Sequence, residues 1–262
     1  MDYLESILLG IVQGLTEFLP ISSSGHLEIS KVLLGNNLSN KESLLFTIVL
    51  HSATAFSTMF YFRKDLLNIF SGLLNTNYNK SHKFSVLIII SMIPAVLVGL
   101  LFEERINSLF EGNLILVGFM LYITAILLFA SDFLERKQNE LNFKSSFLVG
   151  LAQAIAILPG ISRSGATIAT AIIIGIDREK AARFSFIMVI PIIFGSMIKS
   201  LLDHGLNFEN FDITSLLLGF ISAFITGLFA CKWMILLVKK SKLYYFSIYC
   251  LIVGSIIIFY SL

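Results

Sequence analysis

The sequence predicts an all-α polytopic membrane protein, built as an inverted-topology repeat with six transmembrane helices plus two re-entrant, broken helical hairpins. Of the 262 residues, 56% are hydrophobic and only 14% are charged, and the mean hydropathy is +0.86. Soluble domains carry about 25% charged residues. The apolar runs reach helix-spanning length and lack the alternation of barrel strands. Two polar segments that contain proline, and an internal repeat, also support this fold class.

The apolar stretches divide into long and short ones. Six are long enough to span a bilayer: 43–62, 84–102, 114–132, 181–201, 213–236 and 243–261. Four are short and interrupted: 3–18, 22–35, 145–158 and 162–175. The interruptions fall at Pro20 and at Pro159, where proline removes a backbone donor and restricts the residue before it. A serine follows each interruption and is a good helix N-cap. Each short pair therefore predicts two half-helices that meet at a polar tip.

The two interrupted segments resemble each other at a constant offset of 140 residues. Between Gln13 and Gly25 there are 5 identities in 13 aligned positions. The identical pairs are Gln13 and Gln153, Ile21 and Ile161, Ser22 and Ser162, Ser24 and Ser164, and Gly25 and Gly165. We therefore expect a single membrane domain over 1–262, with a first repeat at 1–135 (hairpin 3–35) and a second at 143–262 (hairpin 145–175). Three spans follow each hairpin, so the second repeat is inverted in the membrane.

Loop charge predicts the orientation. With the N-terminus outside, 13 Lys and Arg residues fall in inner loops and 3 in outer loops. The outer three are Lys41, Arg105 and Lys199. This bias predicts that both termini lie outside. The two hairpins then enter from opposite faces, and their tips can meet at mid-membrane.

Composition also excludes several classes of protein. The first segment contains Asp2 and Glu5 and no basic residue before Lys31, so it lacks the basic start of a signal peptide and should be retained. Cys231 and Cys250 lie in apolar stretches and imply no disulfide or metal framework. A net charge of +2 points to no nucleic-acid partner.

The first polar tip carries Gln13 and Glu17, which share one helix face because they are four residues apart. A carboxylate at membrane depth marks a functional site by default. One carboxylate with one amide is compatible with Mg²⁺, which uses few carboxylates together with waters and phosphate oxygens. The alternative is structural, with Gln13 at a helix contact and Glu17 in an ion pair.

The same tip continues with three serines and a histidine. Ser22, Ser23 and Ser24 stand at a half-helix start, where free N–H groups favour an anion, although at least one should act as an N-cap. His26 lies three residues after Ser23, so both can face the same way. A hydroxyl beside an imidazole is a nucleophile with its base.

The second tip carries Arg163 between Ser162 and Ser164, directly after a Pro-Gly break, with Thr167 one turn further on. A guanidinium matches phosphate oxygens in a fork and stays charged at working pH. We expect Arg163 and the flanking hydroxyls to bind phosphate. A structural ion pair between Arg163 and Glu17 is the alternative, and the two roles are compatible.

For the other polar residues in the spans, we expect roles in packing and orientation. We expect Ser52 and Thr54 to form interhelical hydrogen bonds, and we give His51 little weight as a site residue. Orientation by positive charge or snorkelling accounts for Arg178 and Arg183.

These motifs resemble the bacterial undecaprenyl-diphosphate phosphatase family, also called the bacitracin-resistance proteins. The matching segments are Gln13-xxx-Glu17, the run from Glu17 to His26 and the run from Pro159 to Thr167, and the resemblance covers essentially the whole chain. It implies a cytoplasmic-membrane hydrolase that converts undecaprenyl diphosphate to the monophosphate carrier used in peptidoglycan synthesis. It also implies bacitracin resistance, a divalent cation (Mg²⁺ or Ca²⁺) and a site opening on the outer side.

The resemblance assigns roles to residues by their place in the motifs. The catalytic set is Ser23, His26, Glu17 and Arg163. The phosphate-binding set is Ser22, Ser24, Ser162, Arg163, Ser164 and Thr167. The metal ligands are Glu17 and Gln13. The family tends toward His-x-Gly-Thr where this chain has His51-Ser-Ala-Thr54, which we expect to shift helix packing slightly and to preserve activity.

In the mechanism that we expect, Ser23 attacks the terminal phosphorus while His26 or Glu17 takes its proton. A variant with His26 as nucleophile stays open. Two other functions also stay open: a transporter or flippase of a polyprenyl phosphate lipid, and a protein that sequesters the antibiotic. The sequence leaves homo-oligomerisation undecided.

Overall fold

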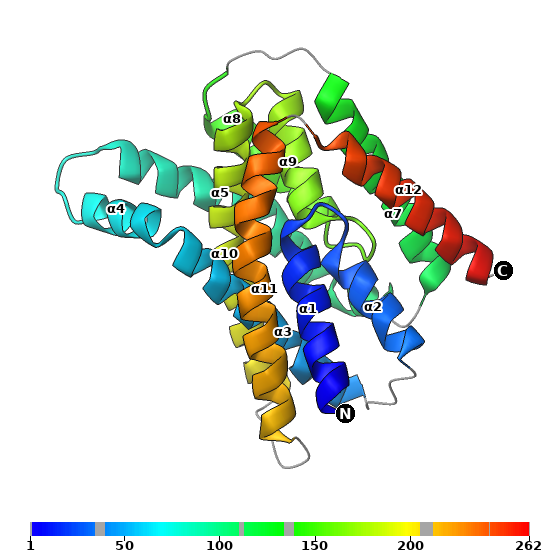
Figure 1. The fold of residues 1–262 in the computed structure, drawn as a ribbon. Coiled ribbons are helices and arrows are strands. Elements are labelled where there is room, and N and C mark those ends of the chain that lie inside the picture. The colour runs from blue at the N-terminus through cyan, green and yellow to red at the C-terminus, as the bar shows by residue number, and fades with distance from the viewer. Residues whose placement is uncertain are drawn as a thin grey trace.

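The computed structural model describes residues 2–34, 40–109, 113–133, 139–204, 212–240 and 242–261. The first half of the chain forms α1 (Tyr3–Phe18), α2 (Ser23–Leu33), α3 (Asn40–Tyr61), α4 (Arg63–Leu73), α5 (Lys80–Leu101), α6 (Glu103–Leu109) and α7 (Leu114–Phe133). The second half forms α8 (Phe143–Ile155), α9 (Arg163–Ile173), α10 (Arg178–His204), α11 (Ile213–Lys239) and α12 (Tyr244–Ser261) (Figure 1). The one β-contact in these ranges is an isolated bridge between Asn139 and Ile176. The chain is therefore all-α, as predicted.

Five of the described helices are long and apolar enough to cross a membrane: α5, α7, α10, α11 and α12. The pair Leu45–Tyr61 and Arg63–Leu73 meets the same criterion together, with a bend of 74° between the two helices. The protein is therefore a polytopic membrane protein, with five or six candidate spans among the described residues. The predicted span 43–62 corresponds to α3, which ends at Tyr61. The short helices α4 and α6 lie outside the predicted spans.

The two interrupted segments fold as helix–break–helix units. α1 ends at Phe18 and α2 begins at Ser23, and Ser22 between them takes a positive φ of 72°. α8 ends at Ile155, earlier than the predicted end at 158, because the chain makes successive turns before Pro159. Residue 158 precedes proline, and such residues avoid helical angles. The break then closes through Gly160, whose φ of 95° suits glycine.

Helices from the two halves of the chain interleave. α1 packs along α11, and its counterpart α8 packs along α5. α7 packs along its counterpart α12, and α3 contacts its counterpart α10. Each hairpin thus lies against a long helix of the other half of the chain. Inversion of the second unit in the membrane stays a prediction.

Glycines permit the closest of these contacts. A Cβ on Gly14 of α1 would lie 2.6 Å from the carbonyl oxygen of Ala223 in α11. A Cβ on Gly150 of α8 would overlap the carbonyl oxygen of Ser91 in α5. Small residues that let helix backbones approach are typical of membrane interfaces. Glycines therefore allow both hairpins to pack closely against their neighbouring helices.

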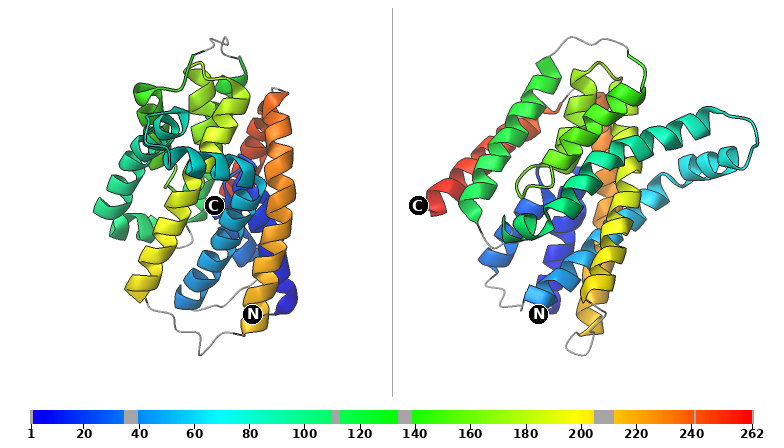
Figure 2. Two further views of the ribbon diagram at one scale, coloured as in Figure 1. Left: turned by 90° about the vertical axis from the view of Figure 1, so that its left-hand side faces the viewer. Right: turned by 180° about the vertical axis from the view of Figure 1, so that it is seen from behind.

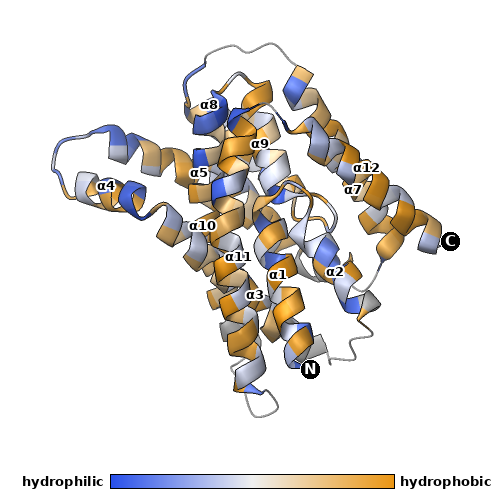
Figure 3. Cartoon of the chain, viewed as in Figure 1, coloured by the Kyte–Doolittle hydropathy of each residue, from blue (hydrophilic) through white to orange (hydrophobic). Residues whose placement is uncertain are grey.

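The outer surface of the bundle is apolar, as expected for contact with lipid. Phe119, Ile126, Phe229 and Phe259 are each more than half exposed, and Figure 3 shows hydrophobic residues along most of the helices. Figure 2 shows the α7–α12 pair on the side of the molecule opposite the projecting α4–α5 hairpin. Buried polar side chains of α1, α3, α9 and α10 include Glu17, Thr58, Thr167 and Ser185.

Candidate active site

The two polar tips meet at an ion pair between Glu17 and Arg163. Glu17 stands in the last turn of α1, and Arg163 is the first residue of α9. The side chain of Glu17 is 4% exposed, whereas that of Arg163 is 27% exposed. The breaks also touch directly, because Ser164 Oγ donates to the Leu19 carbonyl at 3.4 Å. The structure therefore brings together two residues that lie 146 positions apart in the chain.

The Glu17 carboxylate collects hydrogen bonds from three elements. One oxygen, Oε1, faces Arg163. The other, Oε2, accepts from Gln13 Nε2 at 3.0 Å and from Ser23 Oγ at 2.8 Å. His51 Nδ1 lies 3.5 Å from Oε2. A buried carboxylate is costly unless it is paired and hydrogen-bonded, and Arg163, Gln13 and Ser23 meet that requirement.

His26 faces away from Ser23. Its Nδ1 lies 2.9 Å from the Ser22 carbonyl oxygen, and its Nε2 lies 2.8 Å from the Tyr249 hydroxyl of α12. The two rings also stack, with centroids 5.6 Å apart. The expected pairing of the Ser23 hydroxyl with the His26 imidazole is not present, because Ser23 donates to Glu17 instead.

The serines at the two tips have matching local roles. Ser22 Oγ accepts from the Gly25 amide at 3.3 Å, and Ser162 Oγ accepts from the Gly165 amide at 3.1 Å. These bonds cap α2 and α9. The hydroxyls of Ser24 and Ser164 lie 3.4 Å and 3.2 Å from the respective caps.

Thr167 is completely buried and bonds within the protein. Its hydroxyl donates to the Arg163 carbonyl at 2.8 Å and lies 2.5 Å from the hydroxyl of Ser185 in α10. Thr167 therefore ties the start of α9 to α10. The motif predicts a phosphate contact for Thr167, but its hydroxyl bonds to Arg163 and Ser185.

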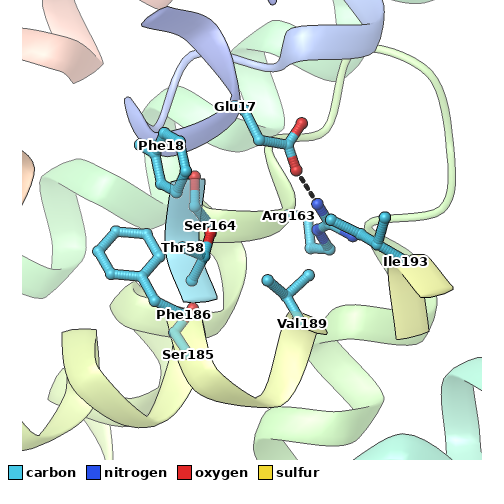
Figure 4. Close-up of a pocket in the computed structure, with 9 residues that line it drawn as sticks. All are labelled: Glu17, Phe18, Thr58, Arg163, Ser164, Ser185, Phe186, Val189 and Ile193. Carbon is cyan, nitrogen blue, oxygen red and sulfur yellow. Dashed lines mark hydrogen bonds and ion pairs between the residues drawn. The ribbon is translucent and has the colours of Figure 1, made fainter. Parts of the chain in front are cut away.

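A pocket opens beside the ion pair. Its lining is Glu17, Phe18, Thr58, Arg163, Ser164, Ser185, Phe186, Val189 and Ile193. Figure 4 shows Glu17 and Arg163 joined on one side, with Phe18 and Phe186 next to each other on the opposite side. The rings of these two phenylalanines meet edge to face at 5.6 Å. The pocket thus places charged, hydroxyl and aromatic side chains around one space.

Sequence reasoning missed several residues of this region. His51 received little weight, and Thr58, Ser185 and Tyr249 received none. The signal for His51 was available, because an ionisable side chain inside a membrane span indicates function by default. Thr58, Ser185 and Tyr249 carry hydroxyls whose roles depend on neighbours that are distant in the sequence.

Arg178 also requires a correction. Snorkelling would leave its guanidinium in water, but the side chain is 7% exposed and Nη1 donates to Asp132 at 2.7 Å. Asp132 in turn accepts from the Tyr244 amide at 2.8 Å. This pair ties together the ends of α7, α10 and α12. Arg183, in contrast, is half exposed and pairs with Asp65, which agrees with a surface role.

The fold and the site define a class of protein: a polytopic membrane protein with a buried carboxylate, guanidinium and hydroxyl centre where two broken helices meet. The family model described as bacitracin resistance protein BacA matches residues 6–256. The chain belongs to this family.

Relatives from distant sources support the assignment. The chain is 57% identical to an undecaprenyl-diphosphatase of Christiangramia forsetii over 254 residues, which cover 97% of this chain and 96% of that protein. It is 46% identical to an undecaprenyl-diphosphatase of Bacteroides fragilis, with 98% of each chain covered. It is 40% identical to one of Methanobrevibacter smithii, with 98% and 97% covered. The likeness therefore extends over nearly the full length.

Proposed function

We propose that this protein is a membrane phosphatase that hydrolyses undecaprenyl diphosphate to undecaprenyl phosphate and inorganic phosphate. The observation that carries the proposal is the hydrogen bond from Ser23 to Glu17 beside Arg163, in a family whose relatives are named undecaprenyl-diphosphatase. The product is the lipid carrier of peptidoglycan synthesis. The family description, bacitracin resistance protein, is consistent with removal of this lipid diphosphate.

Ser23 is the nucleophile in this proposal, and Glu17 takes its proton. The hydroxyl already donates to Glu17 Oε2 at 2.8 Å, within the reach that a general base requires. As the Oγ–P bond forms, the bridging P–O bond breaks and its electron pair leaves with undecaprenyl phosphate. Water then attacks the phosphoserine, inorganic phosphate departs, and the proton returns from Glu17 to Ser23.

Arg163 neutralises the phosphate oxygens. A guanidinium carries five N–H donors in a planar fork, so it can hold Glu17 and phosphate together. Its side chain is more exposed than that of Glu17, which leaves it open to a ligand. Charge neutralisation and positioning are the main catalytic contributions in phosphoryl transfer. Ser164 lines the same pocket and is the flanking hydroxyl best placed to assist.

His26 is the less favoured nucleophile. Both of its ring nitrogens are engaged, one by the Ser22 carbonyl and the other by Tyr249. We assign His26 to the same catalytic tip, one turn along α2 from Ser23. Substitution of His26 tests this role separately from that of Ser23.

The site offers few protein ligands for a divalent cation, Mg²⁺ or Ca²⁺. Among the described residues, no three His, Cys, Asp or Glu side chains form a metal-binding group. Gln13 Oε1, however, is buried beside Glu17 without a hydrogen-bond partner in the described chain. Glu17 and Gln13 would hold the ion together with substrate phosphate oxygens and waters, as Mg²⁺ prefers. The ion would supply further charge neutralisation.

The first prediction concerns the nucleophile. We expect purified protein to release phosphate from a long-chain polyprenyl diphosphate and Ser23→Ala to lose this release by on the order of 10²-fold or more, because its nucleophile is absent. The assay is phosphate release in detergent, with and without chelator. Ser30→Ala, on the same helix, is the control and should retain activity. Full release by Ser23→Ala would exclude the serine mechanism.

The same assay separates the phosphatase from a carrier. Broken helices at mid-membrane also occur in transporters, so a flippase is the alternative function. Detergent solution contains no second compartment and no membrane potential. Hydrolysis there requires a catalyst, whereas a pure carrier would leave the diphosphate intact.

A further inference from the structure

His51 occupies the site in a particular orientation. It lies in the middle of α3, and its side chain is 30% exposed. Its Nδ1 is 2.6 Å from Gln13 Nε2 and 3.5 Å from Glu17 Oε2. Its Nε2, across the ring, makes no hydrogen bond with any described residue. One ring nitrogen thus faces the site network, while the other is free to meet a ligand.

The charge of Glu17 determines which way the Gln13 amide faces. Glu17 is paired with Arg163 and is therefore an ionised group that can only accept hydrogen bonds. The Gln13 atom 3.0 Å from Glu17 Oε2 must then be the NH₂ group rather than the carbonyl oxygen. The amide plane is fixed by this contact.

The same NH₂ group determines the tautomer of His51. An amide nitrogen donates two hydrogens and accepts none. His51 Nδ1 is the partner of its second hydrogen, so Nδ1 must be the unprotonated nitrogen. The ring hydrogen therefore lies on Nε2.

We propose that Gln13 is a positioning residue that holds His51 as its Nε2–H tautomer, and that His51 donates this hydrogen to a phosphate oxygen of the lipid diphosphate. The second part rests on the proposed function. Arg163 shares its charge with Glu17, so a diphosphate needs further donors, and a neutral N–H on a partly exposed ring supplies one. The hydrogen bond adds to transition-state stabilisation without another buried charge.

The residue at position 13 determines which ring nitrogen of His51 carries the hydrogen. A glutamate there would present a carboxylate to Nδ1 and would require the hydrogen on that nitrogen. The second half of the chain contains a natural comparison. Gln153 is the counterpart of Gln13 at the offset of 140, it is 2% exposed, and neither of its amide atoms has a partner among the described residues. Gln153 thus shares the residue type and burial of Gln13 but lacks its contacts.

The tautomer is testable without turnover. The full chain, labelled with ¹⁵N in its histidine rings and purified in detergent, would be examined by NMR. The signal of His51 is assigned among the 4 histidines by its loss in His51→Asn. We expect the ring hydrogen on Nε2 in the wild type and on Nδ1 in Gln13→Glu. Gln153→Glu should leave the His51 signal unchanged.

Several outcomes would overturn the proposal for Gln13. A wild-type hydrogen on Nδ1 would do so, as would an unchanged tautomer in Gln13→Glu. If Gln13→Glu fails to fold, Gln13→Met provides the second variant, because it removes both amide hydrogens at similar volume. His51 should then populate both tautomers. A single Nε2–H form in Gln13→Met would show that Gln13 does not hold the ring.

The phosphate contact is tested in a variant that cannot turn over. A polyprenyl diphosphate is added to labelled Ser23→Ala protein, and the Nε2–H resonance of His51 should shift. No shift would overturn the contact, even if the wild type hydrolyses the lipid. In the wild type, His51→Gln retains an N–H near the Nε2 position, whereas His51→Asn does not. We expect His51→Asn to lose about 10-fold to 100-fold in kcat/KM, as for a lost hydrogen bond to a charged group, and His51→Gln to lose less.

Discussion

Glu17 shows how single residues combine in this site. Its carboxylate would be strongly destabilising between membrane helices if it stood alone. Arg163 balances its charge, and Gln13 and Ser23 fill the remaining acceptor positions. The same bonds that allow Glu17 to be buried also place a hydroxyl and a guanidinium around it. Stability and the proposed chemistry therefore depend on the same contacts.

The second prediction concerns Arg163. Arg163→Ala should lower kcat/KM by on the order of 10²-fold or more, because it removes the donors that stabilise the transition state. Arg163→Lys should recover part of the loss, since an ammonium retains the charge but not the planar fork. The measurement is the initial rate of phosphate release over a range of lipid concentrations.

Arg183 supplies the matched control for Arg163. It lies in the same half of the chain and pairs with Asp65 on the surface, where it is half exposed. Arg183→Ala should retain most of the wild-type activity. Equal losses in the two alanine variants would show that Arg163 contributes general charge rather than a specific contact.

Individual helices depend on close approach at small residues. α1 carries Gln13 and Glu17, and its position is set by the contact of Gly14 with α11. Two residues of the proposed site and the glycine at the helix contact therefore lie within one short element. A shift of α1 would move the carboxylate relative to α9.

The third prediction concerns this contact. Gly14→Ala should destabilise the protein by about 1–3 kcal/mol, because the added Cβ would lie 2.6 Å from the Ala223 carbonyl oxygen and force the helices apart. The measurement is the midpoint of thermal unfolding in detergent, followed by size exclusion. Phosphate release should fall as well, since Glu17 follows within one turn.

Gly99 of α5 provides the control for Gly14. A Cβ at this position would meet no described atom within 4 Å. Gly99→Ala should therefore leave the midpoint unchanged or raise it slightly, because alanine is the better helix former. If both alanine variants unfolded at the same temperature, close packing of α1 on α11 would not limit stability.

At the scale of the whole molecule, the site belongs to both halves of the chain. Glu17 comes from the first hairpin and Arg163 from the second, and each hairpin rests on a long helix of the other half. Neither half could therefore assemble the ion pair alone. Opposite entry of the hairpins, with their tips at mid-membrane, agrees with this arrangement and stays a prediction.

The fourth prediction concerns membrane orientation. Single cysteines would be placed at Thr76 and Asn113, both exposed, after replacement of the buried Cys231 and Cys250 by alanine. The excess of basic residues in the loop that contains Thr76 predicts an inner position. A membrane-impermeant thiol reagent should label Asn113→Cys in intact cells and Thr76→Cys only after permeabilisation. The reverse pattern would invert the predicted orientation.

Features that depend on local interactions were easier to predict from the sequence than contacts between distant residues. Helix bounds at the tips were predicted well, because proline and serine act locally: α1 covers the predicted 3–18. The pairing of Glu17 with Arg163 was foreseen as a structural alternative. The sequence leaves the partner of Ser23 open, because Glu17 and His26 both lie near it along the chain.

The sequence by itself determined the membrane class, the broken hairpins, the internal repeat and the chemical groups at each tip, since composition and local backbone preferences suffice for these. Tertiary structure decided which groups meet. In the folded chain His26 contacts Tyr249, and His51 contacts Gln13. Arg178 is buried against Asp132, and Thr167 contacts Ser185. These contacts join helices distant in the chain. Their choice depends on how helices rotate and approach at small residues, and local sequence does not encode that geometry.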